Sequence, residues 1–157
     1  MSEPRAGEAP PELILDTSVA VKFHVPEEHH QQARQLQDRF EEGAMSLLAP
    51  GTVLPEVFNA FWQKYRRKEL TLVEVRQGWE LISELPLALY APEDLMPRAV
   101  DIAFETGVII YDALFLALAE DAETIVITAD DRMLKALERT SYSDLAQHLT
   151  EVDSLLQ

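Results

Sequence analysis

Four acidic residues of this chain stand where metal-assisted phosphate chemistry would need them. Asp16 and Asp130 come just after short apolar runs typical of buried strands, whereas Glu56 and Asp112 lie in the opening turns of apolar helices. The carboxyl ends of parallel strands and the helix starts that follow them meet at one edge of a sheet, where open α/β sheets place their ligands. Carboxylates gathered within about 4–6 Å raise one another's pKa and repel unless a cation lies between them.

The cation that suits such a site is a hard divalent ion. The chain has no cysteine, so the ligands on offer are oxygens, which favour Mg²⁺ or Mn²⁺ over softer metals. An ion of this kind can orient and activate a water for in-line attack on a phosphodiester and offset the charge that develops. The four acids therefore predict a metal-dependent phosphodiester hydrolase.

Each acid also has a purely structural interpretation. Asp16 and Asp130 stand where a carboxylate caps the following helix. Glu56 and Asp112 stand where a carboxylate complements the positive end of a helix dipole. Asp131 is expected to face solvent, although it could exchange roles with its neighbour Asp130. One such acid would be weak evidence; the recurrence of the same context favours a site.

The elements that position these acids alternate between strand and helix. Apolar runs predict strands at 13–15, 45–49, 87–90 and 124–128, and periodic spacing predicts helices over 27–43, 71–85 and 94–106, with others starting near Thr52, Asp112 and Asp131. This alternation predicts a three-layer α/β/α domain with a mostly parallel central sheet. Residues 12–157 are expected to form that single domain, and residues 1–11, polar and Pro-rich, a flexible leader. After Thr140 the pattern weakens, so the tail is expected to hold a short strand or a frayed helix.

The charge of the chain bears on any RNA-binding role. A net charge of −15 opposes unaided attraction to a phosphate backbone. Two groups of basic residues are candidates for RNA contacts: Lys64, Arg66, Arg67 and Lys68 around Tyr65, and Arg132 and Lys135 after Asp130. For the first group, the alternative that its cations simply complement a helix C-terminus is equally open. No apolar run approaches the roughly 20 residues of a membrane span.

The histidines and aromatic residues have less specific interpretations. His24, His29 and His30 are expected to be exposed and not to bind metal, because sequence neighbours on a helix do not share a face. The aromatic side chains are expected mainly to pack in the core or between helices, and in part to offer a surface to a partner. These aromatic residues are Phe58, Phe61, Trp62, Tyr65 and Trp79.

Four segments around the acids resemble a known family when taken in order. LILDTSV at 13–19, LPEVFNAF at 54–61, YDALFLALA at 111–119 and ITADDRML at 127–134 are similar to the four motifs of PIN-domain proteins, and in particular of VapC-type toxins. Each motif is short, but four in the right order and spacing are a strong signal. The resemblance covers about residues 12 to 140.

The resemblance implies a function and a set of site residues. It implies a cytoplasmic, Mg²⁺- or Mn²⁺-dependent endoribonuclease that is the toxin of a toxin–antitoxin pair, forms a homodimer and accepts a cognate antitoxin. Carried over by position, Asp16, Glu56, Asp112 and Asp130 form the metal-binding catalytic site, and Ser18 matches a supporting hydroxyl.

Two other classes of function were weighed against this one. A PIN-like binding or regulatory module with weak or no cleavage is motivated by the charge of −15, but all four acids are present. Phosphotransfer on an α/β scaffold is disfavoured. A haloacid-dehalogenase-like site needs an acid two places after the strand-end aspartate, where this chain has Ser18. A response-receiver site needs adjacent acids after its first strand, and these are not seen.

Overall fold

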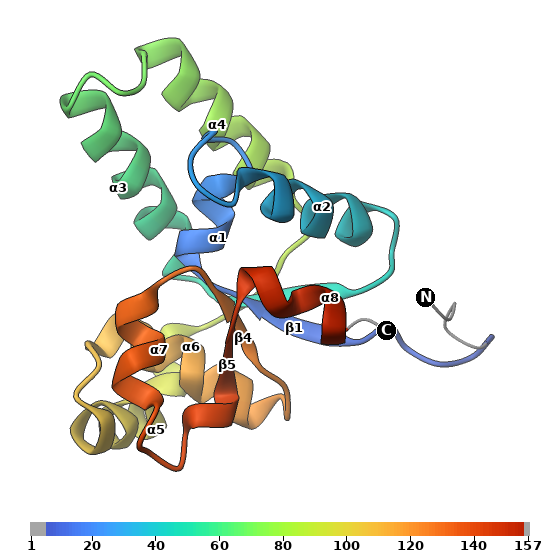
Figure 1. The fold of residues 1–157 in the computed structure, drawn as a ribbon, viewed down its shortest axis with the longest axis vertical. Helices are drawn as coiled ribbons and strands as arrows, with labels where there is room; N and C mark the ends of the chain where they lie inside the picture. Colours follow the sequence, from blue (N-terminus) through green and yellow to red (C-terminus); the bar gives the residue numbers. More distant parts are fainter. Residues whose placement is uncertain (1–5, 156–157) are drawn as a thin grey trace.

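The protein is built around one five-stranded parallel sheet with helices on both sides (Figure 1). The computed structural model describes residues 6–155, and its strands lie in the order β3-β2-β1-β4-β5. The strands are β1 (Glu12–Leu15), β2 (Ser46–Pro50), β3 (Ala88–Tyr90), β4 (Val126–Thr128) and β5 (Ala146–His148). The helices are α1 (Thr17–Lys22), α2 (His30–Glu41), α3 (Val53–Arg66), α4 (Leu72–Glu84), α5 (Pro92–Thr106), α6 (Ile110–Asp121), α7 (Asp131–Leu137) and α8 (Val152–Leu155). The predicted three-layer fold is confirmed.

The first strand is the centre of the sheet because its side chains are covered on both faces. Leu13 of β1 pairs in register with Leu47 of β2, and Leu15 pairs with Ile127 of β4. All of these side chains are buried, as expected for apolar strands between two helical layers. The order of the strands in the sheet differs from their order along the chain, because β1 lies beside β4. Residues from the two ends of the domain therefore meet at one sheet edge.

The helix that carries Asp112 is the most deeply buried one. In α6, every residue from Ala113 to Ala119 is buried, and the helix packs against β1, β2, β4 and α5. An apolar surface on all sides is typical of a core helix. No single helix within residues 6–155 has the length and apolar character of a membrane span; α5 and α6 reach it only jointly, across a bend of 114°.

Helices α3 and α4 form an arm that projects from the sheet (Figure 1). They pack on each other and, through α3, on α1. Gly78 of α4 makes the close approach possible, because a Cβ there would lie 2.6 Å from His24 Cδ2 and 2.9 Å from Phe61 Cε2. The root of the arm is thus fixed to the domain, close to Glu56 at the start of α3.

Several element boundaries differ from those expected. The helix expected from Glu27 begins at His30, because His29 has φ 64° and so leaves the helical region. Thr52 precedes α3, but its side chain makes no cap hydrogen bond. The weak tail contains both β5 and α8, since β5 gains its hydrogen bonds by pairing with β4. Residues 1–5 of the expected leader lie outside the described part of the chain.

Candidate functional site

Asp16 lies at the carboxyl end of the central strand and is almost completely buried. It is the N-cap of α1 and is 4% exposed. Its Oδ2 accepts hydrogen bonds from Ser18 N–H at 3.3 Å, Ser18 Oγ at 2.5 Å and Thr128 Oγ1 at 2.9 Å. Burial raises the pKa of Asp16, these bonds oppose the rise, and the charge of Asp130 adds to it. A buried carboxylate is costly unless charge balances it.

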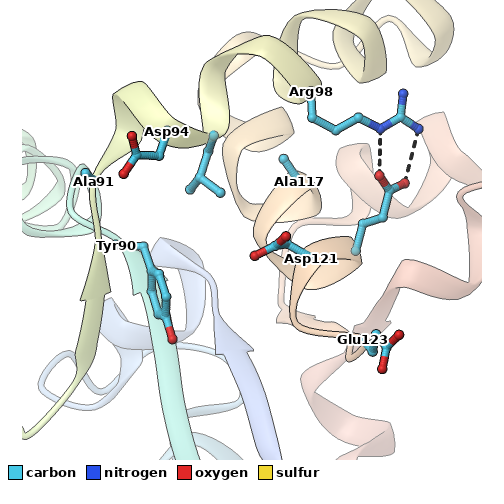
Figure 2. A pocket seen from close by; sticks show the side chains of 9 residues that line it. Tyr90, Ala91, Asp94, Arg98, Ala117, Asp121 and Glu123 are labelled. Atoms are coloured by element: carbon cyan, nitrogen blue, oxygen red, sulfur yellow. Dashed lines mark hydrogen bonds and ion pairs between the residues drawn. The ribbon is translucent and has the colours of Figure 1, made fainter.

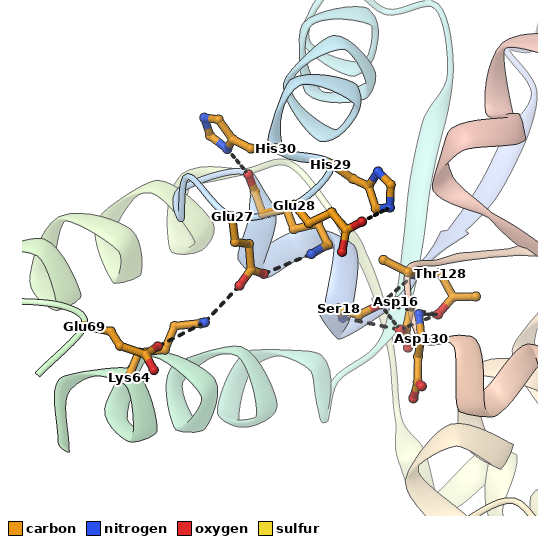
Figure 3. A network of polar contacts seen from close by, with 12 residues as sticks. Asp16, Ser18, Glu27, Glu28, His29, His30, Lys64, Glu69, Thr128 and Asp130 are labelled. Carbon is orange, nitrogen blue, oxygen red and sulfur yellow. Dashed lines mark hydrogen bonds and ion pairs between the residues drawn. The ribbon is translucent and has the colours of Figure 1, made fainter. Parts of the chain in front are cut away.

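Two hydroxyl groups hold the strand ends of β1 and β4 together. Ser18 Oγ donates to Asp16 and accepts from Ala129 N–H at 2.9 Å. Thr128 Oγ1 donates to Asp16 and accepts from Asp130 N–H at 3.0 Å. Figure 3 shows these side chains converging from the two strand ends. The hydroxyls therefore position both Asp16 and Asp130.

Asp130 serves as a helix cap without being withdrawn from the acidic edge. Its Oδ1 accepts from Arg132 N–H at 2.9 Å, which caps α7. The predicted role of Asp130 as a helix cap is thus confirmed. That role does not exclude a second one. Asp131 differs, because its side chain is 93% exposed, which confirms that it faces solvent.

Glu56 and Asp112 reach the same edge from the first turns of α3 and α6. Burial raises the pKa of Glu56 to about 7, the nearby Thr52 hydroxyl opposes the rise without forming a well-aligned hydrogen bond, and the charges of Asp16 and Asp112 add to it. Burial, with the charges of Asp16 and Asp130, raises the pKa of Asp112 to about 7. Each of the four acids is therefore within electrostatic reach of at least two others. The structure brings together all four residues that the sequence singled out.

The donor set fits a hard divalent cation. It consists of carboxylate and hydroxyl oxygens, and Glu56 Oε2 is buried without a hydrogen-bond partner. A cation would supply that missing partner and lower the repulsion that raises the pKa values. Within residues 6–155, no three histidine or acidic side chains are already close enough to enclose one ion.

The two predicted basic groups differ in their surroundings. Lys64 Nζ lies 2.9 Å from Glu27 Oε2 and 3.6 Å from Glu69 Oε2 (Figure 3). Arg67 Nε lies 3.1 Å from Glu69 Oε1, so acids already balance both cations. Arg132 and Lys135 are exposed on α7, the helix that Asp130 caps. The second group is thus better placed to meet a substrate at the acidic edge.

Expectations for the histidines and aromatic residues need correction. His24, His29 and His30 are half-buried rather than exposed, because each lies against a neighbouring element. Of the aromatic residues on α3, only Phe61 is fully buried, whereas Phe58, Trp62 and Tyr65 are 42%, 45% and 39% exposed. Phe58 nevertheless packs edge-on against Trp79 of α4, with the ring centroids 5.9 Å apart, which confirms the expected packing between helices for this pair.

The fold also contains a cavity of about 520 Å³, lined in part by Tyr90, Asp94 and Arg98 (Figure 2). It opens between the end of β3, the start of α5 and the end of α6. Its charged lining consists of Asp94, Arg98, Glu120, Asp121 and Glu123. Arg98 Nε is paired with Glu120 Oε1 at 2.6 Å, so acids dominate the lining. None of the four site acids lines this cavity.

Sequence reasoning missed two features of the acidic edge. Thr128 is the end of a predicted strand, and nothing in its sequence context identifies it as a donor to Asp16. The only local signal was a hydroxyl residue two places before Asp130. His148 was not singled out, because it ends a strand that the sequence barely indicates.

Replacing Ser18 by Ala is expected to destabilise the protein by about 1–3 kcal/mol, because Ala129 N–H loses its acceptor and Asp16 loses the hydroxyl donor of Ser18. Urea unfolding should show a lower midpoint at an unchanged slope. Ser83→Ala removes an exposed hydroxyl at the end of α4 and serves as the matched control. Equal midpoints for the two variants would contradict the bridging role of Ser18.

Comparison with known proteins places these features in context. The model of the family described as PIN domain matches residues 13–139. A curated relative, Ribonuclease VapC3 of Pyrobaculum aerophilum, is 30% identical over 125 residues, which cover 77% of this chain and 91% of the relative.

Solved structures share the fold at low sequence identity. The crystal structure of PAE2754 from Pyrobaculum aerophilum superimposes with a TM-score of 0.67 at 16% identity, covering 99% of this chain and 97% of that one. A toxin–antitoxin complex from Klebsiella pneumoniae contains a chain that superimposes with a TM-score of 0.57 at 14% identity, covering 87% of this chain and 97% of its own. The family match spans all four motifs around the acids.

Proposed function

Because this chain belongs to the PIN-domain family, we propose that it is a metal-dependent endoribonuclease and the toxin of a toxin–antitoxin pair. The observation that carries the proposal is the meeting of Asp16, Glu56, Asp112 and Asp130 at one sheet edge, where burial and neighbouring acids raise the pKa values of the first three. Structural ion pairs lower carboxylate pKa values. Acids that are kept together without cations to balance them instead suit a cation site.

The surroundings of the proposed site residues determine the role of each one. Asp16, fixed by Ser18 and Thr128, and Asp130, fixed at the start of α7, would hold the cation together with Glu56 and Asp112. When bound, the divalent ion supplies Lewis-acid polarisation of the phosphate and screens the charge of the acids. Mg²⁺ and Mn²⁺ both suit an all-oxygen set.

The acids also provide a place for the proton that hydrolysis releases. A site carboxylate that does not coordinate the cation would accept the proton that the attacking water loses. The water oxygen bonds to phosphorus, the bond from phosphorus to the 3′ oxygen breaks, and that oxygen takes a proton. The products are a 5′-phosphate and a 3′-hydroxyl end.

The proposed partners are an antitoxin, a second copy of the chain and RNA in the cytoplasm. A toxin–antitoxin complex among the solved structures of the same fold supports the first. For the second, α5 offers an exposed stripe of Met96, Val100 and Phe104, of which Phe104 is 88% exposed. Residues four apart share one helix face, and such a stripe is typical of an interface.

The test of the proposed function is cleavage of total RNA and transfer RNA by the purified chain. We expect fragments with Mg²⁺ or Mn²⁺ and intact RNA with a chelator. Sequencing of the fragment ends should show 5′-phosphates. A folded protein that binds Mn²⁺ yet cuts neither RNA would favour the alternative of a PIN-like binding module, which the charge of −15 motivates.

A further inference from the structure

Two of the four histidines are fixed by backbone carbonyl groups of other segments. His24 Nε2 lies 2.6 Å from Glu74 O, and the ring packs edge-on against Phe61. His30 Nδ1 lies 2.6 Å from Lys22 O. Each of these rings joins two segments of the helical layer. Their role is explained by the contacts that they make.

The other two histidines face each other. The rings of His29 and His148 are 5.0 Å apart between centroids and inclined by 80°. Their side chains are 27% and 17% exposed. His29 precedes α2 and His148 ends β5, so segments at opposite ends of the domain contribute one ring each. Both rings keep an edge open to solvent.

The pair lies beside the four acids. His148 is the register partner of Thr128, whose hydroxyl donates to Asp16. His148 Nε2 is 3.9 Å from Oδ1 of Asp131, the first residue of α7. Along the edge of the sheet, the carboxyl ends of β1 and β4 therefore present Asp16 and Asp130, and the neighbouring end of β5 presents His148. An RNA strand bound at the acids would contact the histidines next.

The hydrogen bonds of His148 determine which ring nitrogen can serve a ligand. Thr150 N–H donates to His148 Nδ1 at 3.2 Å, so Nδ1 is an acceptor. In the neutral ring the proton is then on Nε2, the nitrogen nearest α7. His148 thus presents an N–H donor at the acidic edge. Such donors bind phosphate oxygens in nucleic-acid complexes.

The backbone at His29 is held in a conformation that helix starts rarely use. Its φ of 64° lies in the left-handed region, where N-cap residues are normally extended. Such positions cost free energy and persist where the surroundings impose them. The result is that the His29 ring is directed to His148. Glu28 Oε1, 3.6 Å from His29 Nε2, is its nearby carboxylate.

We propose that His29 and His148 bind a backbone phosphate of the RNA next to the scissile one. This deepens the proposed function and rests on it. The chain carries a net charge of −15, and Lys22 and Lys64 are both already paired with Glu27, at 3.1 and 2.9 Å. Imidazole N–H donors, with exposed Arg132 and Lys135 on α7, supply phosphate contacts there. The 93% exposed side chain of Asp131 is free to turn away.

The test measures RNA affinity in a chelator, where cleavage is stopped, with a fluorescein-labelled single-stranded RNA of mixed sequence. His148→Ala and His148→Phe should each weaken binding about tenfold, the effect of losing a hydrogen bond to a charged group. His148→Gln keeps an N–H donor and should stay within about threefold of wild type. His29→Ala should weaken binding by a similar factor. His30→Ala, a neighbour outside the pair, is the control, with unfolding midpoints measured for every variant.

The outcomes separate this proposal from the proposed function. In steady-state cleavage with Mg²⁺, the His148 variants should raise KM more than they lower kcat. If His148→Phe binds RNA as wild type does, the ring stacks on a base and the phosphate site is wrong. Equal affinity of all variants, or no measurable affinity of the wild type, would overturn it too. Loss of affinity in His148→Ala and His148→Phe, restored in His148→Gln, by a protein that never cuts RNA would support the phosphate site and reject the nuclease.

Discussion

Replacing Asp112 by Asn is expected to lower kcat for RNA cleavage by at least about a thousandfold while making the metal-free protein more stable. The loss of activity follows because one ligand charge is removed where the cation and the developing phosphate charge are balanced. The gain in stability follows because burial, and then repulsion by Asp16 and Asp130, raise the pKa of Asp112 to about 7, so that its charged form is costly at pH 8. An amide of the same shape removes that repulsion.

The two readouts together identify a functional acid. A structural residue that is replaced lowers stability and activity together, whereas a strained site residue lowers activity and raises stability. We expect the unfolding temperature of Asp112→Asn in chelator at pH 8 to rise by about 2–4 °C. Asp121→Asn, an exposed acid at the other end of α6, is the matched control and should cut RNA at the wild-type rate. Full activity in Asp112→Asn would remove this residue from the site.

The second prediction concerns pH. Without metal, the protein should be less stable at pH 8 than at pH 5, because Glu56 and Asp112 have folded-state pKa values of about 7 and lower ones when unfolded. Between those values the folded state binds more protons than the unfolded state, so stability falls as pH rises through the window from about 4.5 to 7. After discounting for solvent access, the two groups together account for about 2 kcal/mol. That corresponds to a drop in unfolding temperature of roughly 4–8 °C.

Metal should reverse this trend. The carboxylates bind a cation only when deprotonated, so saturating Mg²⁺ is expected to raise the unfolding temperature strongly at pH 8 and little at pH 5. Thermal scans at both pH values, with Mg²⁺ and with chelator, measure the effect. Asp112→Asn should flatten the pH dependence in chelator, whereas Asp121→Asn, with the same change in net charge, should retain it. Identical slopes in the two variants would mean that general surface charge, not the four acids, sets the trend.

The sequence located the acids because their contexts are local. Asp16 follows its strand directly and Asp112 opens its helix, and periodicity reveals both elements within a short window. Parallel strands then place all such ends at one edge, whichever order the strands take. The convergence of the four acids could therefore be predicted without knowing that β4 lies beside β1.

What escaped prediction depends on contacts between distant segments. The sequence shows that Lys64 is positively charged, but it does not show that Lys64 forms an ion pair with Glu27. The strand β5 has only three residues and lies at the sheet edge, so it depends on pairing with β4 rather than on any pattern of its own. The meeting of His29 with His148 needs both α2 and β5 in place, and no spacing within the chain encodes it.

The hydrogen bond from Thr128 to Asp16 joins residues 112 positions apart, and that separation relates the site to the order of synthesis. A nascent chain emerges from the ribosome N-terminus first and folds as its segments become available. A chain interrupted before β4 would contain Asp16, Glu56 and Asp112, but neither the strand that supports Asp16 nor Asp130. We therefore expect chains that end before β4 to leave RNA intact, because they lack Asp130 and the Thr128 hydroxyl that supports Asp16.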